Sequence, residues 1–147
     1  MRGGRVAIAA VLVVLLGLVF AGSALGCSCA PSTPTESLAA SDAAIVARLL
    51  AVERHGGTRA QYSYEVLRVY RGHKQIERGT VVKVMSPRGS ASCALPDRVG
   101  RHFGLFLLRA GGHWSSGLCG VISPRRLGDA AQHSASARPE PKSSCAS

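Results

Sequence analysis

The chain has few aromatic, lysine and acidic residues, and no long hydrophobic run follows its first 26 residues. Aromatic residues make up 5% of 147 residues, and 8 Asp and Glu stand against 18 Lys and Arg. A membrane-spanning helix needs about 20 apolar residues, so we expect no stable membrane insertion. No His-Glu-x-x-His motif occurs, and no nucleophile lies in a recognisable catalytic turn. We therefore expect no enzyme, no cofactor and no resident metal site.

The first 26 residues have the pattern of a secretory signal peptide. Arg2 and Arg5 form a positive n-region, and Val6 to Phe20 is an almost uninterrupted apolar run. Ala24-Leu25-Gly26 places small residues at the two positions that a signal peptidase reads. We therefore expect cleavage before Cys27 and secretion of the rest of the chain to an oxidising extracellular compartment, where disulfides persist.

Five cysteines follow this predicted leader, and four of them lie in two groups far apart in the sequence. Cys27 and Cys29 form a Cys-x-Cys at the start of the mature chain, whereas Cys93 and Cys119 come late in it. Four cysteines allow three pairings, and a bridge between Cys27 and Cys29 would be strained. Two long-range disulfides are therefore expected, in an order that spacing alone does not choose. Cys145 is left over, either as a free tail thiol or in an intermolecular bridge.

Alternating apolar residues predict five β-strands, over residues 43–54, 61–71, 80–86, 102–109 and 113–119. A short helix is expected before them, because Thr33-Pro34-Thr35-Glu36 combines a capping residue, a proline at the first helical position and an acid three residues after the cap. Within the second strand the apolar parity shifts after Val66, which indicates a β-bulge. Short hairpin-like connections favour a small closed antiparallel barrel.

The predicted organisation is a signal peptide, one domain and a tail. The domain, residues 27–131, is all-β with short flanking helices and ends in a closing turn or helix over 121–131. Residues 132–147 are rich in Ser, Ala, Pro and charge, which favours a disordered tail. We expect a monomer.

The excess of positive charge has two interpretations. Without Arg2 and Arg5, 16 Lys and Arg remain against 8 Asp and Glu, and the three remaining lysines are scattered. A nucleic-acid-binding face usually concentrates its basic residues, so we expect a solvated basic surface and no nucleic-acid partner. Tyr62, Tyr64 and Tyr70 could stack on bases, but alternating tyrosines are more often core residues or cross-strand pairs. The alternative hypothesis is attraction to polyanions such as anionic cell-wall polymers.

Several segments together resemble a known family. These segments are Cys27-Ser28-Cys29-Ala30-Pro31, Ile45-Val46-Ala47, Ser92-Cys93 and Gly117-Leu118-Cys119-Gly120. In these four places the chain is similar to the amino-terminal inhibitory domain of the tissue inhibitors of metalloproteinases. The resemblance covers about residues 27 to 127. It implies a five-stranded OB-fold barrel of the netrin-like kind, with Cys27 bridged to Cys93 and Cys29 to Cys119.

The resemblance also implies a mechanism, in which a secreted inhibitor blocks a zinc metalloprotease of the metzincin type. A protease zinc keeps one position open for water or substrate. The α-amino group and carbonyl oxygen of mature Cys27 would occupy it as a bidentate chelate, with the Ser28 side chain in the protease's specificity pocket. Any residue left ahead of Cys27 would turn the amine into an amide, a poor ligand. The implied inhibitory ridge consists of Cys27, Ser28, Cys29, Ala30, Pro31, Ser90, Ala91 and Ser92.

The chain departs from the animal members of that family, and two other functions stay open. We expect no separate carboxy-terminal disulfide-rich region, and Ala39 stands where those proteins have a cysteine. One alternative is a secreted netrin-like binding module without inhibitory activity. The other is a lipoprotein acylated at Cys27, although Ala24 stands where such signals prefer leucine and a thioether would leave Cys93 unpaired.

Overall fold

The structure is a computed structural model that describes residues 27–54, 57–89 and 93–137. The predicted signal peptide, the ridge residues Ser90, Ala91 and Ser92, and Cys145 lie outside the described residues.

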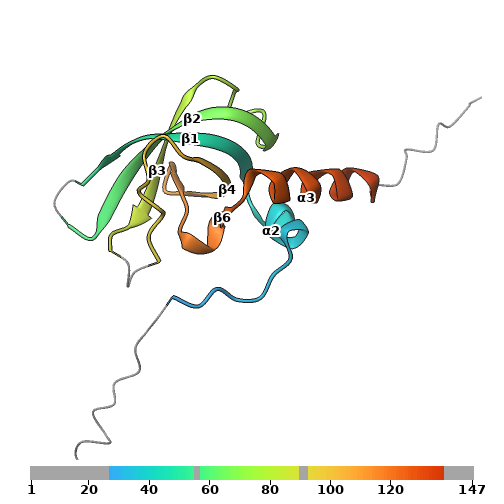
Figure 1. The fold of residues 1–147 in the computed structure, drawn as a ribbon, viewed down its shortest axis with the longest axis horizontal. Coiled ribbons are helices and arrows are strands. Elements are labelled where there is room, and N and C mark those ends of the chain that lie inside the picture. The colour runs from blue at the N-terminus through green and yellow to red at the C-terminus, as the bar shows by residue number, and fades with distance from the viewer. Residues whose placement is uncertain (1–26, 55–56, 90–92, 138–147) are drawn as a thin grey trace, which may run out of the picture.

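Five strands close into a barrel. They are β1 (Ala43–Glu53), β2 (Arg59–Arg71), β3 (Val81–Pro87), β4 (His102–Ala110) and β5 (His113–Ser115). The order β1-β2-β3-β5-β4, with β4 pairing back onto β1, closes the ring, and β6 (Val121–Ile122) pairs with β4 (Figure 1). The predicted OB-fold barrel is therefore confirmed. The prediction that all strands of the barrel are antiparallel is wrong in one place, because β3 and β5 run parallel, with Val84 opposite Trp114.

The long strands β1 and β2 bend where their register slips. Val46 lies opposite Arg68 and the next residue, Ala47, lies opposite Val66, so Leu67 is an extra residue in β2. This is the β-bulge that the parity shift after Val66 predicts. An extra residue increases the local twist and bend of a strand, which helps a short sheet to close on itself.

Side chains that alternate along the strands fill the barrel interior. Ile45, Leu49 and Leu105 are fully buried there together with two tyrosines. The rings of Tyr62 and Tyr64 stack with centroids 6.3 Å apart, so both belong to the core, as the sequence predicts. Tyr62 donates its hydroxyl hydrogen to the Leu95 carbonyl oxygen at 3.0 Å. Among the buried side-chain nitrogen and oxygen atoms of the described residues, the Tyr64 hydroxyl lacks a hydrogen-bond partner.

The first helix, α2 (Pro34–Ala40), begins with the capping box that the sequence predicts. The Glu36 backbone N–H donates to Thr33 Oγ1 at 3.2 Å, and the Thr33 N–H donates to Glu36 Oε2 at 2.7 Å. The bond from the Thr33 backbone lowers the pKa of the Glu36 carboxyl. The helix buries Leu38 against the outside of the barrel. This contact fixes the position of the chain between the amino-terminal segment and β1.

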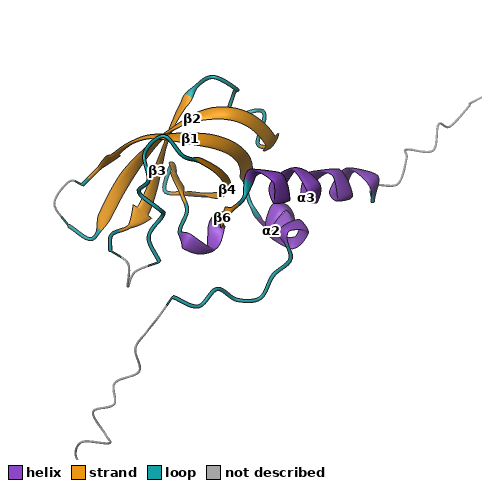
Figure 2. Cartoon of the chain, in the orientation of Figure 1, coloured by secondary structure: helices purple, strands orange, loops and turns teal. Residues whose placement is uncertain are grey.

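The second helix, α3 (Pro124–Ser136), lies beside α2 on the same side of the barrel (Figure 2). Leu127 is fully buried and packs with Leu38 and Phe106. The helix continues through residues 132–136, where the sequence predicts the start of the tail. No helix of the described residues is long and apolar enough to cross a bilayer.

The last barrel strand is shorter than predicted. β5 ends at Ser115, and Cys119 lies in a 3-10 turn, η2 (Leu118–Gly120), rather than in a strand reaching residue 119. The Ser116 Oγ donates to the Phe106 carbonyl oxygen at 2.9 Å, and the Leu118 N–H donates to the Cys93 carbonyl oxygen at 2.7 Å. The Phe106 carbonyl oxygen and the Leu118 N–H are therefore not available for pairing between β4 and a longer β5.

Candidate functional site

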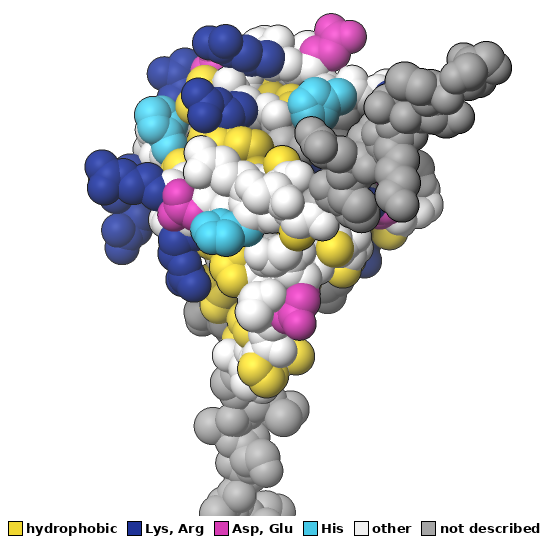
Figure 3. All heavy atoms as spheres, turned by 90° about the vertical axis from the view of Figure 1, so that its right-hand side faces the viewer, with side chains coloured by type: hydrophobic (Ala, Val, Ile, Leu, Met, Phe, Trp, Pro, Cys, Tyr) yellow, Lys and Arg dark blue, Asp and Glu magenta, His cyan; other side chains and the backbone are white. Residues whose placement is uncertain are grey.

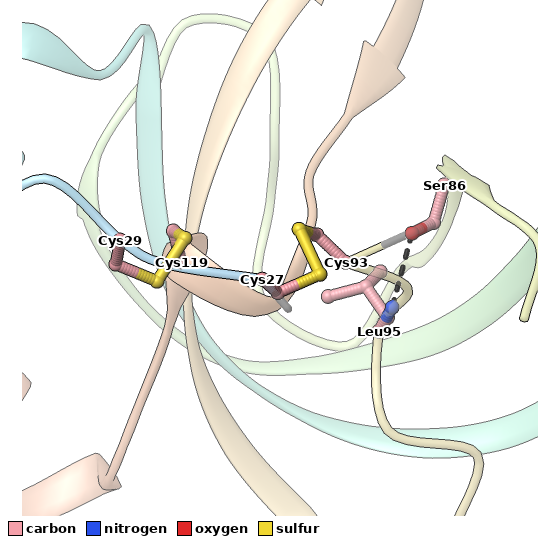
Figure 4. The surroundings of a disulfide bond; sticks show 6 residues. All are labelled: Cys27, Cys29, Ser86, Cys93, Leu95 and Cys119. Atoms are coloured by element: carbon pink, nitrogen blue, oxygen red, sulfur yellow. Dashed lines mark hydrogen bonds between the residues drawn. A yellow bond between two sulfur atoms is a disulfide. The ribbon is translucent and has the colours of Figure 1, made fainter. Parts of the chain in front are cut away.

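Two disulfides join the amino terminus to the barrel. Cys27 is bonded to Cys93 and Cys29 to Cys119, each with its Cα atoms 5.4 Å apart. Figure 4 shows the bridges beside each other, with the amino-terminal segment running from one to the other. The pairing implied by the family resemblance is therefore confirmed.

The segment held by these bridges is a short, exposed piece of main chain. Cys27 is half-buried, while Ser28, Cys29, Ala30 and Pro31 are exposed and belong to no helix or strand. Because the residues on both sides of Ser28 are cross-linked, its position is constrained although its side chain faces solvent. None of these five side chains is an acid or a base. The segment's chemical groups are main-chain nitrogen and oxygen atoms and the Ser28 hydroxyl.

Cys93 connects the two bridges to each other. Its carbonyl oxygen accepts the Leu118 N–H at 2.7 Å, one residue before Cys119. A Cβ on Gly117 would lie 2.9 Å from that oxygen, so glycine permits the close approach. The backbone of Cys93 has φ 57°, a left-handed conformation that costs a non-glycine residue about 1 kcal/mol or more. The two disulfides and this hydrogen bond thus form one continuous network around Cys93.

The chain after Cys93 is fixed to the barrel by a buried serine. The Ser86 side chain, on β3, accepts the Leu95 N–H at 3.0 Å, and Ser86 is only 1% exposed (Figure 4). Sequence reasoning gives no role to Ser86 or Gly117. Gly117 precedes Cys119 by two residues, which is the only local signal, whereas nothing near Ser86 in the sequence points to its distant partner.

An apolar cavity of about 480 Å³ lies beside the bridges. Cys93 and Cys119 are among its lining residues, with Met85 from β3 and Phe106 and Leu108 from β4. Leu108 is 53% exposed and Leu118, in the adjacent turn, is 43% exposed. Exposed apolar side chains next to a constrained main chain are features of protein–protein contact surfaces. In the residues described, no three His, Cys, Asp or Glu side chains gather as a metal site would require.

Comparison with known proteins identifies the family. A family model described as tissue inhibitor of metalloproteinase matches residues 25–146, a range that includes both disulfides. A comparison with curated proteins finds no match. The matched family consists of inhibitors rather than catalysts, which fits the expectation that the chain is not an enzyme, and the disulfides fit an extracellular setting. The chain belongs to the tissue inhibitor of metalloproteinase family.

Proposed function

We propose that the mature protein is a secreted inhibitor of zinc metalloproteases of the metzincin type. In this proposal the chain starts at Cys27 after removal of residues 1–26, and the α-amino nitrogen and carbonyl oxygen of Cys27 bind the protease's zinc. The observation that carries it is the double attachment of the amino terminus, through Cys27 to Cys93 and through Cys29 to Cys119.

The chemistry needs only main-chain atoms. A catalytic zinc has three protein ligands and one open position, at which it activates water. A bidentate ligand from the inhibitor displaces that water. The pKa of an α-amine is about 7.7 to 8.0, so giving up its proton near neutral pH costs only about 1 kcal/mol. The ligand atoms therefore become available without any basic side chain.

Constraint before binding explains how so short a segment binds tightly. Ordering one residue's backbone costs about 1–2 kcal/mol, a cost that a flexible amino terminus meets at the moment of binding. Here Cys27 and Cys29 are held in the unbound protein. Ser28, exposed between them, is the side chain that we assign to the specificity pocket. Residues 90–92, which precede Cys93, form the second part of the ridge in this proposal.

The disulfide at Cys27 argues against the lipoprotein alternative. Acylation forms a thioether at the cysteine sulfur, and that sulfur is bonded to Cys93. A lipidated Cys27 would release Cys93 from the network that holds the ridge.

The test compares chains that differ only at their ends. The first starts at Cys27, the second carries one alanine ahead of Cys27, and a control carries one alanine after Ser147. Inhibition of a zinc metzincin is measured with a peptide substrate. We expect the amino-terminal alanine to weaken inhibition at least about a hundredfold, or about 2.7 kcal/mol, and the carboxy-terminal alanine to have no effect.

Two results would contradict the proposal. Equal inhibition by the extended and unextended chains would mean that the α-amine is not a ligand. Binding to a protease from which zinc has been removed, with unchanged affinity, would mean that the ridge does not contact the metal and would favour the binding-module alternative.

A further inference from the structure

The apolar cavity beside the disulfides has the size of a small-ligand site and is separate from the inhibitory ridge. Its volume of about 480 Å³ lies within the range of about 300–1,000 Å³ that is typical of ligand pockets. The barrel contributes Met85, Phe106 and Leu108 to its lining, and α2 contributes Ser37 and Ala40. Of the ridge residues that the structure describes, none lines this cavity.

The polar groups around the cavity are already satisfied. Ser41, Ser115 and Ser116 line it, but each donates its hydroxyl hydrogen to a main-chain carbonyl oxygen, at 3.0, 3.3 and 2.9 Å. Cys93 and Cys119 contribute sulfur atoms that are held in disulfides. The lining therefore offers a ligand mainly apolar contacts, which favours a ligand that is largely hydrocarbon.

One charged side chain borders the cavity. Arg59, the first residue of β2, is exposed and is the charged residue among the described residues of the lining. Its partner on β3 is Pro87, and both also line a neighbouring hollow of about 680 Å³, so Arg59 lies at one end of the apolar cavity. Neither of the two ion pairs within the described ranges involves Arg59. Its guanidinium is therefore available to an anionic group of a ligand.

We propose that the cavity binds a fatty acid, with the carboxylate at Arg59 and the alkyl chain along the apolar lining. A carboxylate is ionised near neutral pH, and a guanidinium binds it through two parallel hydrogen bonds. Met85 lies opposite Ser115, and Ser115 lies opposite Leu108, so the lining continues across neighbouring strands.

The dimensions of the sheet set the length of the ligand. In the order β2-β3-β5-β4, three strand spacings separate Arg59 from Leu108, about 14 Å. A fully extended chain advances about 1.2 Å for each bond, so a fatty acid of about ten carbons spans this distance. Leu108 is 53% exposed, and the alkyl chain would cover part of that apolar surface.

Two other occupants fit the cavity less well. A second copy of the chain would carry the same excess of positive charge, since Lys and Arg outnumber Asp and Glu by 18 to 8. Figure 3 shows Lys and Arg side chains gathered along one side of the face in view. Like charges oppose association of two copies. A neutral apolar ligand would make no use of the Arg59 guanidinium.

The test follows the methyl group of Met85, because Met85 lines the cavity and the other methionine is Met1. The protein is isotopically labelled at its methionine methyl groups and titrated by NMR with octanoate, decanoate and decanol, each below its aggregation limit. We expect a saturable shift of the Met85 signal. Decanoate should bind about four- to fifteenfold more tightly than octanoate, because two more methylenes leave water. It should bind about three- to fivefold more tightly than decanol, as an exposed charge pair allows.

Two pairs of variants locate the head group and the alkyl chain. Arg59→Gln is compared with Arg98→Gln, which removes the same charge from an exposed position outside the cavity. Only Arg59→Gln should abolish the preference for decanoate over decanol. Leu108→Thr is compared with Leu50→Thr, since Leu50 is also on a strand and 38% exposed but does not line the cavity. Leu108→Thr should weaken the binding of both ligands about fivefold, and Leu50→Thr less than about twofold.

Several outcomes would overturn the proposal. A Met85 signal that decanoate leaves unchanged would exclude the site. Equal affinities for decanoate and decanol, or equal effects of Arg59→Gln and Arg98→Gln, would exclude recognition of the carboxylate. A Met85 signal that moves with protein concentration alone would assign the cavity to contacts between copies. The titrations contain no protease, so their result does not depend on the proposed inhibition.

Discussion

Removing one disulfide at a time tests how the two bridges constrain the chain. Taken alone, loops of 66 and 90 residues would stabilise the fold by about 4.4 and 4.6 kcal/mol in the chain-entropy model. The loops overlap, however. With one bridge intact, the shortest path between the other pair runs along residues 27–29 and 93–119, about 28 residues, for which the model gives about 3.6 kcal/mol.

Removing either disulfide is therefore expected to lower the free energy of unfolding by the same amount, although the two closed loops differ in length. Cys27→Ser/Cys93→Ser and Cys29→Ser/Cys119→Ser should each lower the free energy of unfolding by about 3.6 kcal/mol. Replacing all four cysteines should cost about 8 kcal/mol, which is comparable to the whole stability of a domain and should prevent folding.

The assay is urea unfolding followed by fluorescence of Trp114, which is half-buried against the barrel core. Mass measurement before and after reduction confirms that the remaining bridge is formed. Losses of about 4.4 and 4.6 kcal/mol, the values for the two loops taken alone, would refute the shared-loop reasoning.

Three further predictions concern single residues. Tyr64→Phe should raise the free energy of unfolding by about 1 kcal/mol in urea titrations, because it removes a buried hydroxyl without a hydrogen-bond partner. Burial raises the pKa of the Tyr64 hydroxyl. Above about pH 10 the unfolded chain therefore loses the hydroxyl proton while the folded chain keeps it. The free energy of unfolding should then fall by up to about 1.4 kcal/mol per pH unit. Tyr64→Phe should reduce that slope, and an identical slope would contradict the assignment. Gly117→Ala should weaken protease inhibition more than it lowers the free energy of unfolding, because the added Cβ would press on the Cys93 carbonyl oxygen. The control is Gly104→Ala, whose Cβ would clash with Ile122. It should lower the free energy of unfolding by about 1–3 kcal/mol without a specific loss of inhibition.

The parts of the fold that the sequence predicts are those decided locally. The helix at Pro34 follows from Thr33 and Glu36, three residues apart, and the bulge at Leu67 follows from a change of parity within one strand. The end of β5 is different, because it depends on bonds from Ser116 to Phe106 and from Leu118 to Cys93. No pattern within residues 113–119 contains those partners, so alternation alone extends the strand too far.

The candidate site divides in the same way. The sequence identifies the cysteines but allows three pairings, and only the family resemblance selects the one that the structure has. The role of Ser86 depends on Leu95, which returns to it after a loop. The same holds for Arg68 and Arg78, which lie ten residues apart in the sequence and which the fold places at one cavity.

The proposed mechanism separates what Cys27 contributes as a residue from what it contributes as the first residue. Its zinc ligands are a main-chain nitrogen and oxygen, which any amino acid in that position would supply. Its sulfur supplies only the bond to Cys93. Cys27→Ser/Cys93→Ser should therefore keep the ligand atoms and lose their fixed position, whereas Cys29→Ser/Cys119→Ser keeps Cys27 attached. If the two double variants are equally stable, any weaker inhibition by Cys27→Ser/Cys93→Ser measures the effect of losing the fixed position of the ligand atoms. We expect inhibition to be about tenfold weaker for each backbone residue that must be ordered on binding.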